Sequence, residues 1–158
     1  MYNKEIERKW LVKRELLPDL INYPMSVIKT GYLSQVHDSL MVRIRSIDDE
    51  LFSIDLKDSG TKVRNEITFN ITKEEFDISF ALAGNKTLSK KRFKVPSSVD
   101  PSRILEVDVI EELDMILVEY EAESETLVDT IFIEPWFGLE VTEDFTYTNI
   151  QLAYKKIQ

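Results

Sequence analysis

The first strand-like segment of the chain carries a charged residue at every second position. In the run EIERKW, which begins at Glu5, the side chains of Glu5, Glu7 and Lys9 share one face if the segment is a β-strand. Ile6 and Trp10 then share the opposite face. Carboxylates bind divalent cations such as Mg²⁺, and ammonium or guanidinium groups bind phosphate oxygens. A face with both kinds of group could therefore hold a phosphate compound together with a metal ion.

The same alternation recurs along the chain. Two arrangements explain it: the charged faces are the solvated outer faces of an ordinary antiparallel sheet, or they line the inside of a closed barrel. Burying many charges is costly unless they pair with each other or with a ligand, so the second arrangement implies a bound ligand. The cations are Lys9, Arg43, Arg45, Lys57, Arg64, Lys90 and Arg92, and the carboxylates are Glu5, Glu7, Glu66, Glu106, Asp108, Glu119, Glu121 and Glu140.

Alternating apolar residues and turn residues predict strands over most of the chain. A helix is predicted to start at Thr72 as N-cap, with Glu75 placed for a capping box, and to stop at Gly84. Shorter helical pieces are predicted at 12–20, interrupted at Pro18, and at 124–130 and 147–156. The predicted strands are residues 26–33, 40–47, 51–56, 64–71, 87–95, 103–109 and 116–123, with 139–142 extended and the EIERKW segment as a further strand.

These elements predict one domain over residues 1–158, of the α+β class and mainly β. The predicted fold is a closed eight-stranded antiparallel β-barrel with helices packed outside. The last helix, at 147–156, is a candidate plug for the barrel. Trp10, Trp136 and Phe137 are expected to pack on the outer face, and the single histidine, His37, is assigned no role.

Composition restricts the class of protein. The chain has 158 residues with 43% hydrophobic and 31% charged residues, as is typical of a globular domain. The net charge of −9 argues against a nucleic-acid-binding protein. There is no cysteine, no apolar segment long enough to span a membrane and no signal-peptide pattern at the first residues. We therefore expect a cytoplasmic protein with no nucleic-acid or membrane partner.

The order and spacing of several short motifs resemble those of the CYTH domain proteins, bacterial members of the triphosphate tunnel metalloenzyme superfamily. The resemblance covers essentially the whole chain. The motifs are ExExK at 5–9, GYL at 31–33, VRxR at 42–45 with Lys57 after it, RxE at 64–66, KxR at 90–92, EVD at 106–108, ExE at 119–121 and WxGxEVT at 136–142.

This resemblance implies a tunnel that binds a small-molecule triphosphate with Mg²⁺ or Mn²⁺. It implies catalytic roles for Lys9, Glu5 and Glu7, with Lys9 positioning or activating the attacking water or binding phosphate. Glu106 could bind metal or an internal cation. The implied phosphate-binding residues are Lys9, Arg43, Arg45, Lys57, Arg64, Lys90 and Arg92, and the implied metal ligands are Glu5, Glu7, Glu66, Asp108, Glu119, Glu121 and Glu140.

The sequence departs from the family pattern at two positions with chemical consequences. Many members have RxExE where this chain has Thr68 in place of the second acid, and RYxN where it has Thr146 in place of the arginine. The hypothesis is a hydrolase of inorganic triphosphate, or of another triphosphate compound. The alternatives are a class IV type adenylyl cyclase that makes cyclic AMP from ATP, and a non-catalytic polyphosphate-binding module. Either a monomer or a homodimer is compatible with the sequence.

Overall fold

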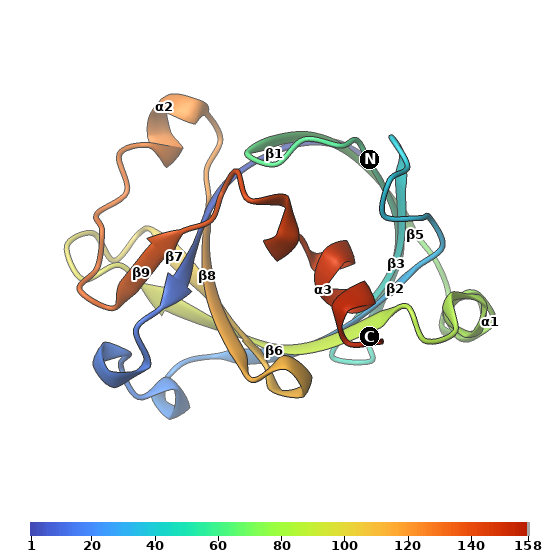
Figure 1. The fold of residues 1–158 in the computed structure, drawn as a ribbon, viewed down its shortest axis with the longest axis horizontal. Coiled ribbons are helices and arrows are strands. Elements are labelled where there is room, and N and C mark those ends of the chain that lie inside the picture. The colour runs from blue at the N-terminus through green and yellow to red at the C-terminus, as the bar shows by residue number, and fades with distance from the viewer. Residues whose placement is uncertain (158) are drawn as a thin grey trace.

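The computed structural model describes residues 1–157, and its strands form one antiparallel sheet that closes into a barrel (Figure 1). The sheet has nine strands in the order β5-β4-β3-β2-β6-β7-β8-β1-β9, and a further pairing of β5 with β1 closes the ring. The first eight strands make the barrel, and β9 lies outside the ring. The strands are β1 (Tyr2–Val12), β2 (Met25–Tyr32), β3 (Met41–Ile47), β4 (Leu51–Lys57), β5 (Val63–Asn70), β6 (Thr87–Pro96), β7 (Ile104–Ile110), β8 (Met115–Glu121) and β9 (Phe137–Glu140). The predicted closed eight-stranded barrel is confirmed.

Strand β1 closes the barrel because it pairs with β5 on one edge and with β8 on the other. Its residues 2–6 pair with β5, and its residues 7–11 pair with β8. Beyond the end of β5, the same edge of β1 pairs with β9, where Trp10 lies opposite Glu140 and Val12 opposite Phe137. The EIERKW segment is therefore the strand on which the two ends of the sheet meet.

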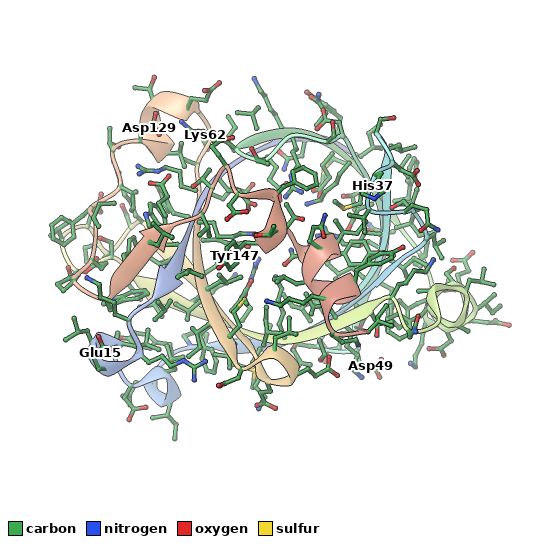
Figure 2. All side chains as sticks on the ribbon, in the orientation of Figure 1. Glu15, His37, Asp49, Lys62, Asp129 and Tyr147 are labelled. Atoms are coloured by element: carbon green, nitrogen blue, oxygen red, sulfur yellow. The ribbon has the colours of Figure 1, made fainter. Side chains whose placement is uncertain are left out.

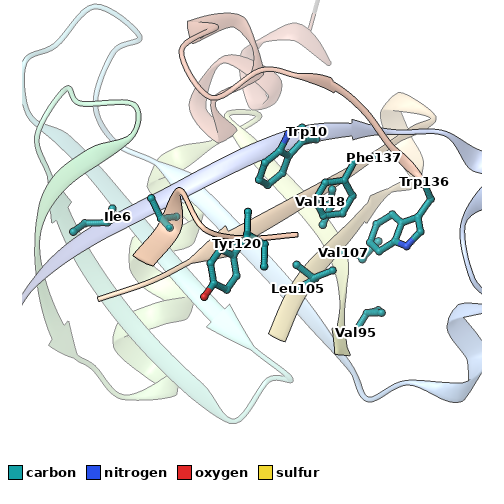
Figure 3. Close-up of a cluster of buried hydrophobic side chains, with 11 residues drawn as sticks. Ile6, Trp10, Val95, Leu105, Val107, Val118, Tyr120, Trp136 and Phe137 are labelled. Atoms are coloured by element: carbon teal, nitrogen blue, oxygen red, sulfur yellow. The ribbon is translucent and has the colours of Figure 1, made fainter. Parts of the chain in front are cut away.

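The largest apolar core lies outside the barrel, on the outer faces of β1, β6, β7 and β8 (Figure 3). The segment that follows β8, which includes α2 (Glu125–Val128), covers this face. The rings of Trp10 and Phe137 stack with centroids 4.6 Å apart, and Trp136 meets Phe137 edge-on at 4.8 Å. All three aromatic residues are buried, which confirms their expected place on the outer face.

Helix α1 (Lys73–Ala83) packs outside the barrel against β2, β3 and β4. It begins and ends as predicted, because Thr72 and Glu75 form a capping box and Gly84 follows its last residue with φ of 61°. The helix approaches β2 closely at Gly31, where a Cβ atom would lie 2.8 Å from the Cβ of Ala83. A glycine at this position therefore allows α1 to lie flat on the barrel.

The C-terminal helix α3 (Asn149–Lys155) lies over one opening of the barrel, where Figure 1 shows it within the ring of strands. Its buried residues Ile150 and Leu152 join a second apolar cluster that includes Tyr32, Leu88 and Leu117 of the strands. The expectation of helices outside the barrel therefore holds for α1 and α2, whereas α3 takes the place of the candidate plug. It is preceded by the 3-10 turn η4 (Phe145–Tyr147).

Some local predictions were wrong in their boundaries. The helical piece expected at 12–20 is instead the end of β1 followed by two 3-10 turns, η1 (Arg14–Leu16) and η2 (Leu20–Asn22). The two turns lie on either side of Pro18, where the interruption was predicted. The turn η3 (Glu111–Leu113) connects β7 to β8. Within residues 1–157, no helix combines the length and apolar character that a membrane crossing requires.

Candidate active site: a charged tunnel

The charged faces of the strands point into the barrel, which decides between the two arrangements that the sequence left open. Across the β1–β8 ladder, Lys9 lies opposite Glu119 and Glu7 opposite Glu121. A cavity that is partly open to solvent lies between the strands and encloses about 100 Å³ of water-accessible space. Its lining residues are Asn3, Glu5, Glu7, Ile28, Thr30, Arg43, Arg45, Arg64, Glu66, Lys90, Arg92, Glu106, Glu119, Glu121 and Asn149.

One wall of the tunnel is built by β3, β4 and β5. Arg43 binds the carboxylate of Asp55 through Nε and Nη2, at 2.8 and 2.7 Å. The Nε of Arg45 lies 3.6 Å from the same carboxylate and has no hydrogen-bond partner. Arg45 is thus the less constrained of the two arginines, and its guanidinium is available to a ligand.

Lys57 lies behind this wall rather than in it. Its side chain is 2% exposed, and its Nζ lies 2.9 Å from Glu5 Oε1 and 2.9 Å from Glu66 Oε2. Both glutamates line the cavity, whereas Lys57 does not. The structure therefore places the expected phosphate-binding Lys57 where it orients two carboxylates.

The opposite wall contains Lys90 and Arg92 of β6, with Asp108 of β7 behind them. Asp108 is 1% exposed and accepts hydrogen bonds from Lys90 Nζ at 2.6 Å and from Arg92 Nε at 2.7 Å. Arg92 also binds Glu119 at 2.9 Å and forms an ion pair with Glu106. Asp108, expected as a metal ligand, is thus placed to hold two cations in position.

Lys9 faces the end of the tunnel that η4 and α3 cover. Its Nζ lies 3.0 Å from Glu119 Oε1 and donates to the carbonyl oxygen of Tyr147 at 3.3 Å. Figure 2 shows Tyr147 over the barrel opening, whereas His37 lies at the periphery. Burial alone lowers the pKa of Lys9, but the Glu119 and Glu7 carboxylates outweigh burial and raise it. Lys9 is therefore a permanent cation at neutral pH.

The carboxylates of β1 have very different proton affinities. Burial, and then the nearby carboxylates of Glu119 and Glu5, raise the pKa of Glu7 from 4.5 to about 7. For Glu5, burial acts in the same direction, but Lys57 and Arg64 outweigh it and lower the pKa to about 2. Burial raises both pKa values, so the difference between them comes from the neighbouring charges. Cations outweigh burial at Glu5, whereas carboxylates add to it at Glu7.

The acidic groups around Glu7 fit a hard divalent cation in their chemistry. Carboxylate oxygens are the ligands that Mg²⁺ and Mn²⁺ prefer. The carboxylates of Glu119 and Glu5 lie close enough to Glu7 to add to the rise in its pKa that burial causes. Among residues 1–157, however, no three acidic or histidine side chains are gathered as a ready metal site. Each of Glu5 and Glu119 instead binds protein cations.

The structure separates Glu140 from the other expected metal ligands. Glu140 lies opposite Trp10, whose side chain packs outside the barrel. Its carboxylate forms an ion pair with Arg8 and accepts a hydrogen bond from Thr142 Oγ1 at 2.8 Å. With 38% of its side chain exposed, Glu140 lies on the outer surface and does not line the cavity.

Sequence reasoning missed four lining residues, Asn3, Ile28, Thr30 and Asn149, and also Asp55 behind the wall. Asp55 follows the same alternation on β4 as Lys57, two positions away, and this signal could have found it. Asn3 similarly precedes Glu5 by two positions. Asn149 had no such signal, because it reaches the cavity from the start of α3.

Known proteins were compared with this chain. No family model matches it. The inorganic triphosphatase of Nitrosomonas europaea is 32% identical over 151 residues, which cover 94% of this chain and 96% of that protein. The crystal structure of an inorganic triphosphatase superposes with a TM-score of 0.69 at 30% identity, over 94% of this chain and 93% of the other.

The chain belongs to the CYTH family of triphosphate tunnel metalloenzymes. More distant likenesses show the same fold. A putative adenylate cyclase from Bacillus halodurans has a TM-score of 0.56 at 21% identity, over 81% of this chain and 85% of that one. A putative adenylyl cyclase from Hippeastrum, described as having a dominant triphosphatase activity, has a TM-score of 0.53 at 16% identity, over 82% and 83%.

Two positions depart from the CYTH pattern, and the structure locates both. Thr146 is exposed, and its hydroxyl and backbone N–H donate to Asp144 Oδ1. Thr146 does not line the cavity. Thr68 lies inside the barrel, directly opposite Asp55 on β4. Thr68, which replaces an acid of the CYTH pattern, therefore has the carboxylate of Asp55 beside it.

Proposed function

We propose that this protein hydrolyses inorganic triphosphate to pyrophosphate and orthophosphate with the help of Mg²⁺ or Mn²⁺. The main support for this proposal is the lining of the tunnel, where guanidinium and ammonium groups on two facing walls alternate with carboxylates. Such groups bind phosphate oxygens and a divalent cation at the same time. The likeness to an inorganic triphosphatase over almost the whole chain supports this assignment.

The composition of the cavity favours inorganic triphosphate over a nucleotide. A nucleotide base usually lies against apolar or aromatic side chains. Among the lining residues of this cavity, Ile28 is the one apolar side chain, and none is aromatic. The cyclase alternative requires a place for adenine, and the described part of the cavity offers charged groups instead.

The phosphate-binding residues on the cavity walls are Arg43, Arg45, Arg64, Lys90 and Arg92. We assign them to the oxygens of the triphosphate, because arginine matches such oxygens with two parallel hydrogen bonds. Lys9 adds a fixed positive charge near the closed end of the tunnel, where its raised pKa makes it unsuited to accept a proton. Its proposed role is therefore to bind and orient phosphate.

The carboxylates Glu5, Glu7, Glu119 and Glu121 are the proposed holders of the divalent cation, and Glu66 is a further candidate. When bound, the ion neutralises phosphate charge and activates water for attack on the terminal phosphorus. Glu7 carries a proton over part of the neutral pH range, so cation binding there requires the loss of that proton. The activity should therefore rise with pH around 7 at limiting metal.

Product analysis tests this proposal. The purified protein is incubated with inorganic triphosphate, ATP or thiamine triphosphate, each with Mg²⁺, with Mn²⁺ or with chelator. Metal-dependent release of pyrophosphate and orthophosphate from inorganic triphosphate is the expected result. The control pair is Glu119→Gln, which should abolish turnover, and Glu140→Gln on the outer surface, which should not.

Two outcomes would contradict the proposal. Formation of cyclic AMP from ATP, with little hydrolysis of triphosphate, would assign the protein as a cyclase. Strong thermal stabilisation by triphosphate without turnover under any metal would assign it as a binding module. Full activity of Glu119→Gln would refute the metal assignment alone.

A further inference from the structure

The tunnel contains a carboxylate that the family pattern does not place there. The pattern has its second RxExE acid at the position of Thr68, which cannot supply a charge. Directly across the β4–β5 ladder lies Asp55, and Arg43 lies opposite Asp55 on β3. Arg43, Asp55 and Thr68 thus form one row across three strands.

Every bond in this row is directed at the aspartate. Asp55 Oδ2 accepts hydrogen bonds from Arg43 Nε at 2.8 Å and binds Nη2 at 2.7 Å. Asp55 Oδ1 accepts a hydrogen bond from the Thr68 hydroxyl at 2.9 Å. The threonine therefore fixes the rotation of the carboxylate, and the carboxylate in turn fixes the guanidinium of Arg43.

Asp55 acts behind the wall of the cavity. Its side chain is 0% exposed and is absent from the lining, whereas Arg43 and Arg45 line the cavity. A substrate in the tunnel would therefore touch the arginines and not Asp55. Burial alone raises the pKa of Asp55, but Arg43 and Arg45 outweigh it and lower the pKa, so the group is charged at neutral pH.

We propose that Asp55 is a positioning residue that replaces, from the neighbouring strand, the acid missing at Thr68, and that it holds Arg43 in the orientation that binds triphosphate. This inference rests on the proposed triphosphatase function. Without Asp55, Arg43 would retain only the longer contact of 3.4 Å to Glu66 and would lose its fixed direction. Arginine binding by paired hydrogen bonds depends on that direction.

The experiment compares steady-state kinetics and thermal unfolding of wild type, Asp55→Asn, Asp55→Thr, Thr68→Glu and the double variant Asp55→Thr/Thr68→Glu. Asp55→Asn should raise the KM for triphosphate about 10- to 100-fold, the range lost with a hydrogen bond to a charged group. Its kcat should change less than KM, because Arg43 would bind substrate and transition state alike. The double variant should recover a KM close to wild type, since it moves the acid back across the row.

A matched control separates positioning from a general loss of stability. Glu134 is also a buried carboxylate, 4% exposed; it accepts hydrogen bonds from Ser97 and Ser98, and none of the three lines the cavity. Glu134→Gln should lower the melting temperature and leave KM unchanged. If Asp55→Asn lowers the melting temperature with the same unchanged KM, Asp55 is structural and the proposal is overturned.

Two further outcomes decide the remaining cases. If Asp55→Asn does not fold, the double variant Asp55→Thr/Thr68→Glu decides the question alone. A KM for triphosphate no lower than that of Asp55→Thr overturns the proposal, and a KM close to that of wild type supports it. If wild type does not hydrolyse triphosphate, the proposed function fails. Calorimetric binding of triphosphate to the same variants then tests Asp55, with a higher Kd for Asp55→Asn than for Glu134→Gln supporting it and equal Kd values refuting it.

Discussion

Replacing Glu7 by glutamine should make the metal-free protein more stable at pH 8. The Glu7 side chain is 9% exposed, and its pKa is raised from 4.5 to about 7, first by burial and then by Glu119 and Glu5. Folding therefore favours the protonated carboxyl. The contribution of this group to stability is full below pH 4.5 and is lost as the pH rises through about 7.

The size of the effect follows from the two pKa values. A rise from 4.5 to about 7 corresponds to at most about 3 kcal/mol in the free energy of unfolding between pH 5 and pH 8. Glutamine resembles the protonated carboxyl at every pH. Glu7→Gln should therefore match wild type near pH 5 and exceed it at pH 8, with a melting temperature about 5–10 °C higher.

The assay is thermal and urea unfolding of both proteins at pH 5 and pH 8, with chelator and then with Mg²⁺. Added Mg²⁺ should remove much of the advantage of the variant, because the cation neutralises the carboxylate in wild type. Glu5→Gln is the control, since the pKa of Glu5 is about 2 and its stabilising charge is present at both pH values. That variant should be less stable at pH 5 and at pH 8. An equal difference between wild type and Glu7→Gln at both pH values would refute the reasoning.

Three other substitutions test the placement of individual side chains. Arg45→Ala should raise the KM for triphosphate about 10- to 100-fold with little change in melting temperature, because its Nε has no hydrogen-bond partner and lies 3.6 Å from Asp55; unchanged KM would remove Arg45 from the phosphate-binding set. Glu140→Gln should retain activity and lose less than about 1 kcal/mol of stability, as its ion pair with Arg8 is partly exposed; metal-dependent inactivation would contradict its place outside the tunnel. Leu152→Ala, at a residue 1% exposed between α3 and the barrel, should cost about 2–5 kcal/mol in urea unfolding; a neutral result would mean that α3 does not stabilise the closed end.

The sequence was sufficient to predict which residues share a face, because alternation along a strand is a local property. Hence the pattern predicted that the charged residues of β3, β6 and β8 share one face of each strand, whereas the structure decided that this face points inward. The capping box of Thr72 and Glu75 is equally local, and it was also predicted. In each case, the residues that determine the structure are neighbours in the chain.

The layers within the tunnel could not be predicted in this way. Lys57 binds Glu5 across 52 positions, and Arg92 reaches Glu119 across 27. Because these partners are far apart in sequence, the local pattern does not indicate which charged residue faces the cavity and which lies behind it. Glu140 was assigned to the tunnel for a similar reason, because the face of a short strand depends on its register against β1.

The position of β1 also determines when the site can form during folding. Closure of the barrel brings the first strand to residues near the other end of the chain; the Lys9 amide, for example, binds Thr142 across 133 positions. Contacts so distant in sequence form slowly, because the closure of a long loop must precede them. An intermediate with only β2 to β8 paired would contain the cations of β3 and β6 without Glu5, Glu7 and Lys9. Recovery of activity on refolding should therefore follow barrel closure, with no earlier, partly active phase.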